Sequence, residues 1–118
     1  MHTARFVKLA MSFVLLFSAL EAIAGVDISG PVQAVQVAPD GTLWFAMDTT
    51  PASTYCISGW MGLTMYVPND HPQYPYYFAM LVAAASKNKN VYVGNISIYN
   101  GSSSCDITKT GYGLVFLQ

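Results

Sequence analysis

The 118-residue chain has few charged side chains: only 9% of its residues are charged, whereas 53% are hydrophobic. This composition excludes a disordered protein, because disordered chains are rich in charge and poor in aromatic residues. Five Lys and Arg against six Asp and Glu provide no basic surface for phosphate groups, which excludes nucleic acid as a partner. The length is that of a single domain.

The first 24 residues have the three parts of a secretory signal peptide. A short basic stretch precedes the apolar run Leu9 to Leu20, and Ala22-Ile23-Ala24 gives the small-x-small pattern typical of a cleavage site. The apolar run is shorter than the roughly 20 residues of a membrane-spanning helix, and Glu21 closes it. We therefore expect removal of residues 1–24, no stable membrane anchor, and a single small β-barrel domain of residues 25–118 that is secreted or periplasmic.

Cysteine is also scarce: Cys56 and Cys105 are the only two, and both lie in the predicted mature domain. A catalytic thiol needs a histidine partner or a CxxC context, and neither local sequence supplies one. Two cysteines and one mature histidine are too few for a zinc site. The sequence therefore predicts one structural disulfide, formed in an oxidising compartment, and neither a metal nor another cofactor.

Alternating apolar and polar residues predict a hairpin at the start of the mature domain. Its strands are Val32–Val37 and Thr42–Met47, joined by a turn at Pro39-Asp40-Gly41 whose residue types favour tight turns. A polar loop, Asp48–Ser53, follows, and a third strand is expected within Tyr55–Tyr66, with a bend or bulge at its glycines.

A helix is predicted from Tyr76 to Lys87, with Pro75 suited to its first turn. Its apolar face is expected to be buried and consists of Phe78, Leu81, Val82 and Ala85.

Beyond the helix the sequence again favours strands. Val91–Tyr99 is predicted as a strand with a bulge at Gly94-Asn95, because its apolar residues change parity there. A last strand or pair, with a kink at Gly111-Tyr112-Gly113, is expected between Cys105 and Leu117.

Three strands, a helix and two strands is the element order of the OB-fold, a small Greek-key barrel. We therefore predict a β-rich α+β domain: a five-stranded OB-fold-like barrel with one helix between the third and fourth strands and one disulfide. A cystatin-like or another α+β sheet is the main alternative.

Residues suited to catalysis are few. His71 is the only mature histidine, and no Gly-x-Ser-x-Gly elbow accompanies the Asp70-His71 pair. Five aspartates without a mature glutamate offer no evident carboxylate pair for glycoside hydrolysis, and no glycine-rich phosphate loop occurs. We expect no enzyme, and a small hydrolase that uses His71 is the alternative.

Tyrosine and tryptophan are abundant, and both supply rigid amphipathic area at binding surfaces. Tyr74, Tyr76 and Tyr77 cannot all face inward on one helical turn, so at least one should be exposed. Trp44 and Trp60 fit either the core or a binding platform, with the core favoured. The candidate binding residues are Trp60, Tyr74, Tyr76 and Tyr77.

Residues 32–117 resemble, in the order of their elements, small secreted bacterial proteins and the B subunits of subtilase-cytotoxin and pertussis-like toxins. The most specific stretch is Tyr77 to Val93, an alanine-rich helix that leads into a strand. The resemblance implies an OB-fold, a pentameric ring and binding of host glycans without catalysis. Those subunits tend to carry additional cysteines, and their sugar-contacting serine matches no residue here, so no binding residue is transferred.

Two functions remain. The first is a secreted, non-enzymatic binding module that is glycan-directed and assembles as a homo-oligomer, such as a toxin B-subunit-like pentamer. The alternative is a monomeric periplasmic or secreted protein-binding factor, such as an inhibitor or an envelope protein. The low charge and the tyrosine content favour association over a solitary monomer.

Overall fold

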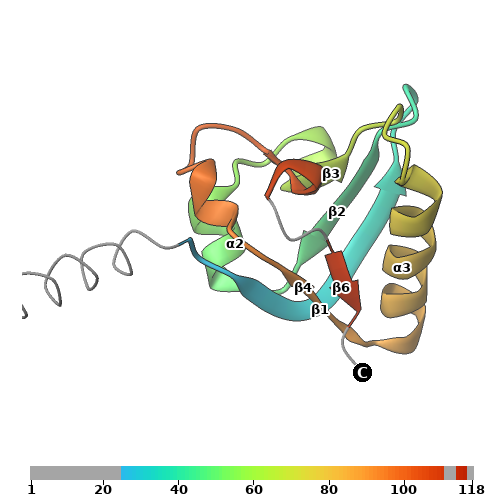
Figure 1. Cartoon of the computed structure of the whole chain (residues 1–118), viewed down its shortest axis with the longest axis horizontal. Helices are drawn as coiled ribbons and strands as arrows, with labels where there is room; N and C mark the ends of the chain where they lie inside the picture. Colours follow the sequence, from blue (N-terminus) through green and yellow to red (C-terminus); the bar gives the residue numbers. More distant parts are fainter. Residues whose placement is uncertain (1–24, 111–113, 117–118) are drawn as a thin grey trace, which may run out of the picture.

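The computed structural model of the chain describes residues 25–110 and 114–116 (Figure 1). The predicted signal peptide, residues 1–24, and the kink predicted at residues 111–113 lie outside these ranges. Within them, no helix combines the length and the apolar character that crossing a membrane requires.

The strands of the described part of the chain form one curled sheet, a half-barrel, in the order β5-β3-β2-β1-β4-β6 (Figure 1). All neighbouring strands are antiparallel except β3 and β5, which are parallel. The two edge strands, β5 and β6, follow one another along the chain, so the predicted last strand or pair is a pair. The strands are β1 Ile28–Val37, β2 Leu43–Met47, β3 Met65–Val67, β4 Asn90–Val93, β5 Cys105–Asp106 and β6 Leu114–Phe116.

The predicted hairpin is present as β1 and β2, with Val37 paired to Leu43 next to the turn. The backbone N–H of Thr42 donates to Oδ1 of Asp40 at 2.9 Å, and Gly41 has a φ of 89°. These are the roles that the residue types of this turn predict, since Asp bonds its own backbone and Gly tolerates a left-handed conformation.

A short helix, α2, spans Thr50–Tyr55, where a polar loop was predicted over Asp48–Ser53. Pro51 lies in its first turn, where its missing N–H costs no hydrogen bond. Ala52 is buried against the core and anchors the helix. The loop prediction was therefore wrong here, because one buried alanine and a helix-starting proline outweigh four polar side chains.

The third strand is much shorter than the Tyr55–Tyr66 segment in which it was predicted. β3 begins only at Met65, after a 3-10 turn, η1, at Trp60–Gly62. Gly62 has a φ of 78°, and Met61 also lies in the left-handed region with a φ of 54°. Two consecutive left-handed residues cannot continue a strand, so the bend predicted at the glycines is a complete loop.

The main helix, α3, spans Tyr74–Lys87 and lies between β3 and β4 in the chain, as predicted. It begins two residues before the predicted start, with Pro75 in the first turn. Asn88 ends it in a left-handed conformation, and the N–H groups of Asn88 and Lys89 both donate to the carbonyl of Ala84. The helix packs along β1, β4 and β6 (Figure 1).

The buried face of α3 differs from the predicted one. Leu81 and Ala84 are buried, whereas Phe78 and Val82, predicted to be buried, are 40% and 38% exposed. Apolar residues surround most of this helix, so the spacing of apolar residues in the sequence fits more than one buried face. The hydroxyl of Tyr74 donates to the carbonyl of Gly41 in the β1–β2 turn. This bond helps to orient the side of α3 that carries Tyr74 and Tyr77 toward the sheet.

The strand predicted over Val91–Tyr99 ends early. β4 stops at Val93, and Asn95, with a φ of 58°, begins a 3-10 turn, η2, at Ile96–Ile98. The N–H of Ile96 donates to the carbonyl of Val26, and the Ile96 side chain is fully buried. The change of parity thus reflects a new element rather than the predicted bulge.

One hydrophobic core fills the inside of the half-barrel. Alternate residues of β2 and β3 point into it, which is the period-two pattern of a sheet with one buried face. Its largest fully buried side chains include Phe45, Leu43, Met65, Leu81, Ile96 and Ile107.

Asp106 of β5 is a carboxylate inside this core, with 3% of its surface exposed. Its Oδ1 accepts the N–H of Thr108 at 2.9 Å and the hydroxyl of Thr108 at 2.6 Å. The Tyr99 hydroxyl donates to the Asp106 carbonyl and accepts the Asp106 N–H. Burial, and then the negative charge of Asp106, raise the pKa of Tyr99 to about 12. The Asp106 carboxylate therefore stabilises the 3-10 turn η3, Ile107–Lys109, that follows β5.

The predicted disulfide is present: Cys56 is bonded to Cys105 across a sequence separation of 49 residues. Both cysteines are buried, and the bond joins the end of α2 to the edge strand β5. It therefore closes a large loop of chain that contains β3, α3 and β4.

Replacing both cysteines, in Cys56→Ser with Cys105→Ser, should lower the free energy of unfolding by about 4 kcal/mol, because the unfolded chain regains the entropy of a loop of this size. Urea titration of a chain of residues 25–118 measures the change. Reduced wild-type protein is the control and should lose a similar amount. Equal stability with and without the bond would show that the core alone holds the fold.

Candidate functional site

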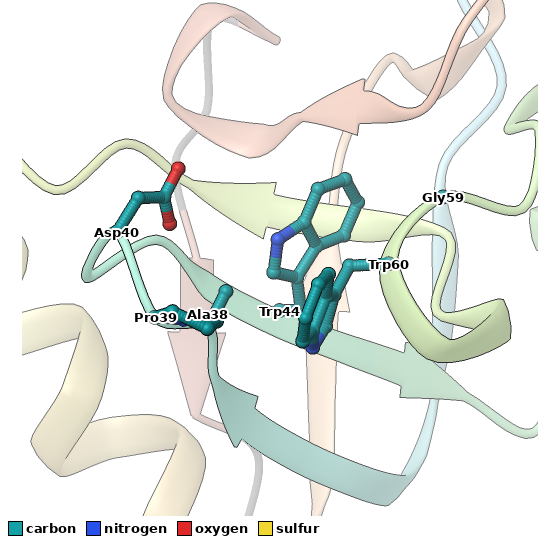
Figure 2. A pocket seen from close by; sticks show the side chains of 6 residues that line it. All are labelled: Ala38, Pro39, Asp40, Trp44, Gly59 and Trp60. Atoms are coloured by element: carbon teal, nitrogen blue, oxygen red, sulfur yellow. The ribbon is translucent and has the colours of Figure 1, made fainter.

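A groove of about 500 Å³ lies beside the β1–β2 turn. We call it the tryptophan groove, because two indole rings line it together with a carboxylate (Figure 2). The turn contributes one wall, β2 contributes the floor, and the loop around η1 contributes the other wall. Its lining residues are Ala38, Pro39, Asp40, Trp44, Gly59 and Trp60.

Asp40 is the charged group of the tryptophan groove, and its side chain stands on the turn at one end of the groove (Figure 2). Hydrogen bonds from the backbone and then the side chain of Thr42 lower the pKa of the Asp40 carboxyl. The carboxylate is exposed to solvent and is negatively charged at neutral pH.

The turn that carries Asp40 is bonded to the start of α3 and to the segment before it. The side-chain amide of Asn69 donates to the backbone carbonyl of Asp40. The Tyr74 hydroxyl donates to the neighbouring carbonyl of Gly41 at 2.8 Å. These two bonds fix the turn, and with it the position of the carboxylate, against the rest of the domain.

Trp44 forms the floor of the groove. Its neighbours in β2, Leu43 and Phe45, are fully buried on the inner face, so Trp44 points to the outer face of the sheet. Its cross-strand partner is Tyr66 of β3, and their ring centroids are 4.8 Å apart with planes inclined by 40°. Aromatic cross-strand pairs of this kind stabilise a sheet, so the platform is rigid.

The wall around η1 depends on the absence of a side chain at Gly59. A Cβ at this position would lie 2.6 Å from Cη2 of Trp44 and 2.7 Å from Oγ of Ser104. The loop is closed by the N–H of Gly59, which donates to the carbonyl of Leu63 at 2.8 Å. Trp60 is the next residue in the chain, is 38% exposed and lines the groove together with Trp44 (Figure 2).

The structure does not bring the four predicted binding residues together. Trp60 lines the groove, on a 3-10 turn rather than on a strand. Tyr76 is 67% exposed on α3, which meets the expectation that one tyrosine of this turn faces solvent. Tyr74 and Tyr77 pack against the core, so they support the domain and are not on an open surface.

Sequence analysis missed Trp44 and Asp40 as groove residues. Asp40 was assigned to the turn alone, and Trp44 was expected in the core. The alternation of β2 does contain the signal for Trp44, because Leu43, Phe45 and Met47 share the buried parity and leave Trp44 on the other face. What the sequence lacks is any sign that the η1 loop folds over that face.

His71, the alternative catalytic residue, lies in the segment before α3. Its Nδ1 accepts the backbone N–H of Gln73 at 3.1 Å, and its ring meets the ring of Tyr77 edge-on at a centroid distance of 5.7 Å. Among the residues that the structure describes, no group of three or more His, Cys, Asp or Glu side chains is placed to hold a metal ion.

Comparison with known proteins identifies no relative: no family model matches the chain, and neither a curated protein nor a solved structure is detectably similar to it.

Gly59→Ala should displace Trp44, because the added Cβ overlaps the indole ring, and it should cost about 1–3 kcal/mol of stability as an overpacked contact does. In a Trp60→Phe background, Trp44 is the only tryptophan of residues 25–118, so its fluorescence maximum reports the displacement directly. The Trp60→Phe variant with Gly59 retained is the control. An unchanged spectrum and an unchanged urea midpoint would contradict the close contact.

Proposed function

We propose that this protein is a non-enzymatic, extracytoplasmic glycan-binding module and that the tryptophan groove is its ligand site. The observation that carries the proposal is the placement of two indole rings and one carboxylate in a single groove on a rigid sheet. An indole face can cover the apolar face of a sugar ring, while a carboxylate accepts hydrogen bonds from its hydroxyl groups.

The volume of the groove supports a small ligand. Ligand sites are commonly concave spaces of about 300–1,000 Å³, lined mainly by apolar side chains with a few polar groups that orient the ligand. The tryptophan groove has this composition, and its volume of about 500 Å³ lies within this range.

We also infer that the domain is an OB-fold. The pairing of β1 with both β2 and β4, of β2 with β3, and of β3 in parallel with β5 supports this assignment, as does the position of α3 between β3 and β4. OB-folds bind oligosaccharides on the face of the second and third strands and on the loop between the first two. The tryptophan groove lies on β2 and on the β1–β2 turn.

The proposed compartment is outside the cytoplasm, either the periplasm or the exterior of the cell. The Cys56–Cys105 disulfide supports it, because such bonds persist in oxidising compartments. The predicted signal peptide at residues 1–24 is the second argument, made from the sequence alone.

A homo-oligomer, such as a pentamer, is part of the proposal. The outer face of α3 supports it, since Phe78 and Val82 are four residues apart, share one side of the helix and are both exposed. Apolar patches on a chain with so little charge favour association. The alternative, a monomeric protein-binding factor, would use the same helix face for a different protein.

Trp44→Ala and Trp60→Ala should each weaken sugar binding by about tenfold or more, because each removes one stacking surface. A glycan array identifies the sugar, and calorimetry with that sugar measures the change in Kd. Tyr76→Ala is the matched control, since it removes an exposed aromatic residue that does not line the groove, and it should leave the Kd unchanged. Binding that is lost in Tyr76→Ala but kept in both tryptophan variants would place the site elsewhere.

Light scattering coupled to size exclusion on residues 25–118 should give a mass near five protomers. Phe78→Lys should shift it toward the monomer, because a charge on the outer face of α3 would oppose burial. Gln33→Lys, an equal charge at an exposed position of β1, should not. A monomeric wild type would favour the protein-binding alternative.

A further inference from the structure

The tryptophan groove is electrostatically one-sided. Asp40 is negatively charged, and no lysine or arginine lines the groove. Hydrogen bonds from Thr42 stabilise the ionised Asp40 carboxyl. Thr42 is uncharged, so these bonds do not neutralise the negative charge. A ligand that enters the groove therefore meets a net negative charge.

The lysines of the described residues are not placed to reverse that charge. Lys87 and Lys89 lie at the end of α3, beside the start of β4, where β1 pairs at Pro31. Val37, next to the turn, lies six positions after Pro31 in β1, a distance of roughly 20 Å in an extended strand. This exceeds the screening length of about 8 Å at physiological salt. Lys109, the third lysine, is on η3 and is not a lining residue.

The two indole rings act in the same direction as the carboxylate. The face of a tryptophan ring carries partial negative charge and attracts a cation that lies within about 6 Å of its centre. Trp44 and Trp60 both line the groove with Asp40, so a ligand there lies beside two indole rings and the carboxylate (Figure 2).

We propose that the tryptophan groove selects a sugar that carries a protonated amine, with the ammonium group at the Asp40 carboxylate and the sugar ring against Trp44 and Trp60. The inference rests on the proposed glycan binding and names the class of ligand. Amino sugars with a free amine are favoured, N-acetylated sugars bind more weakly, and acidic sugars such as sialic acids are disfavoured by like charge.

The test compares three ligands on the mature domain by tryptophan fluorescence: a glucosamine trimer, an N-acetylglucosamine trimer and sialyllactose. At about pH 6 the amine is protonated and Asp40 is ionised. We expect the glucosamine trimer to bind roughly tenfold more tightly than its N-acetylated counterpart, because it adds one ion pair and one cation–π contact. Sialyllactose should bind most weakly.

Asp40→Asn is the diagnostic variant, because an asparagine oxygen can still accept the N–H of Thr42 and preserve the turn. It should bring the two trimers to similar affinity while the N-acetylated trimer still binds. Asp48→Asn removes an exposed carboxylate that does not line the groove, and it should retain the tenfold preference.

Equal affinity of the two trimers for the wild-type protein would overturn the inference and leave the proposed function standing. No fluorescence response to any sugar would overturn both. Choline, a cation without a sugar ring, is the last arm of the test. If choline binds as tightly as the glucosamine trimer, the sugar part of the inference is wrong and only the attraction of Asp40 for a cation remains.

Discussion

The bond between Cys56 and Cys105 is the constraint on which the rest of the structure depends. It ties the end of α2 to the edge strand β5, and backbone hydrogen bonds continue the connection on both sides, from Ile57 to Ser103 and from Gly101 to Tyr55. The loop that follows Cys56 is therefore held against the outer face of the sheet.

This attachment creates the groove. The outer face of β2 would otherwise present Trp44 on an open sheet, and the η1 loop brings Trp60 and the bare backbone of Gly59 over its edge. The other wall, at Asp40, is fixed independently by its bonds to Thr42 and Asn69. Two walls with separate supports keep the groove open without a ligand, which reduces the entropy lost on binding.

Local signals predicted the parts of the fold that local interactions decide. The hairpin turn and the position of α3 were confirmed, since turn chemistry and a helix start at Pro75 are local signals. The disulfide is a long-range bond, and it was confirmed because two cysteines allow only one pairing. The buried face of α3, the end of β4 and the helix α2 were not predicted, because contacts with distant residues decide each of them. Of the candidate binding residues, Trp60 lines the groove, and Tyr74 and Tyr77 support the domain.

The sequence by itself determined the residue chemistry available to this protein: little charge, many aromatic rings, one pair of cysteines and one tight acidic turn. Only the tertiary structure decided which of those groups line one groove. Asp40 and Trp44 are four residues apart on the β1–β2 hairpin, so the local sequence already places them near each other. Trp60 lies on a different element and lines the same groove, and the disulfide that holds the end of α2 against β5, just before this loop, joins residues 49 positions apart.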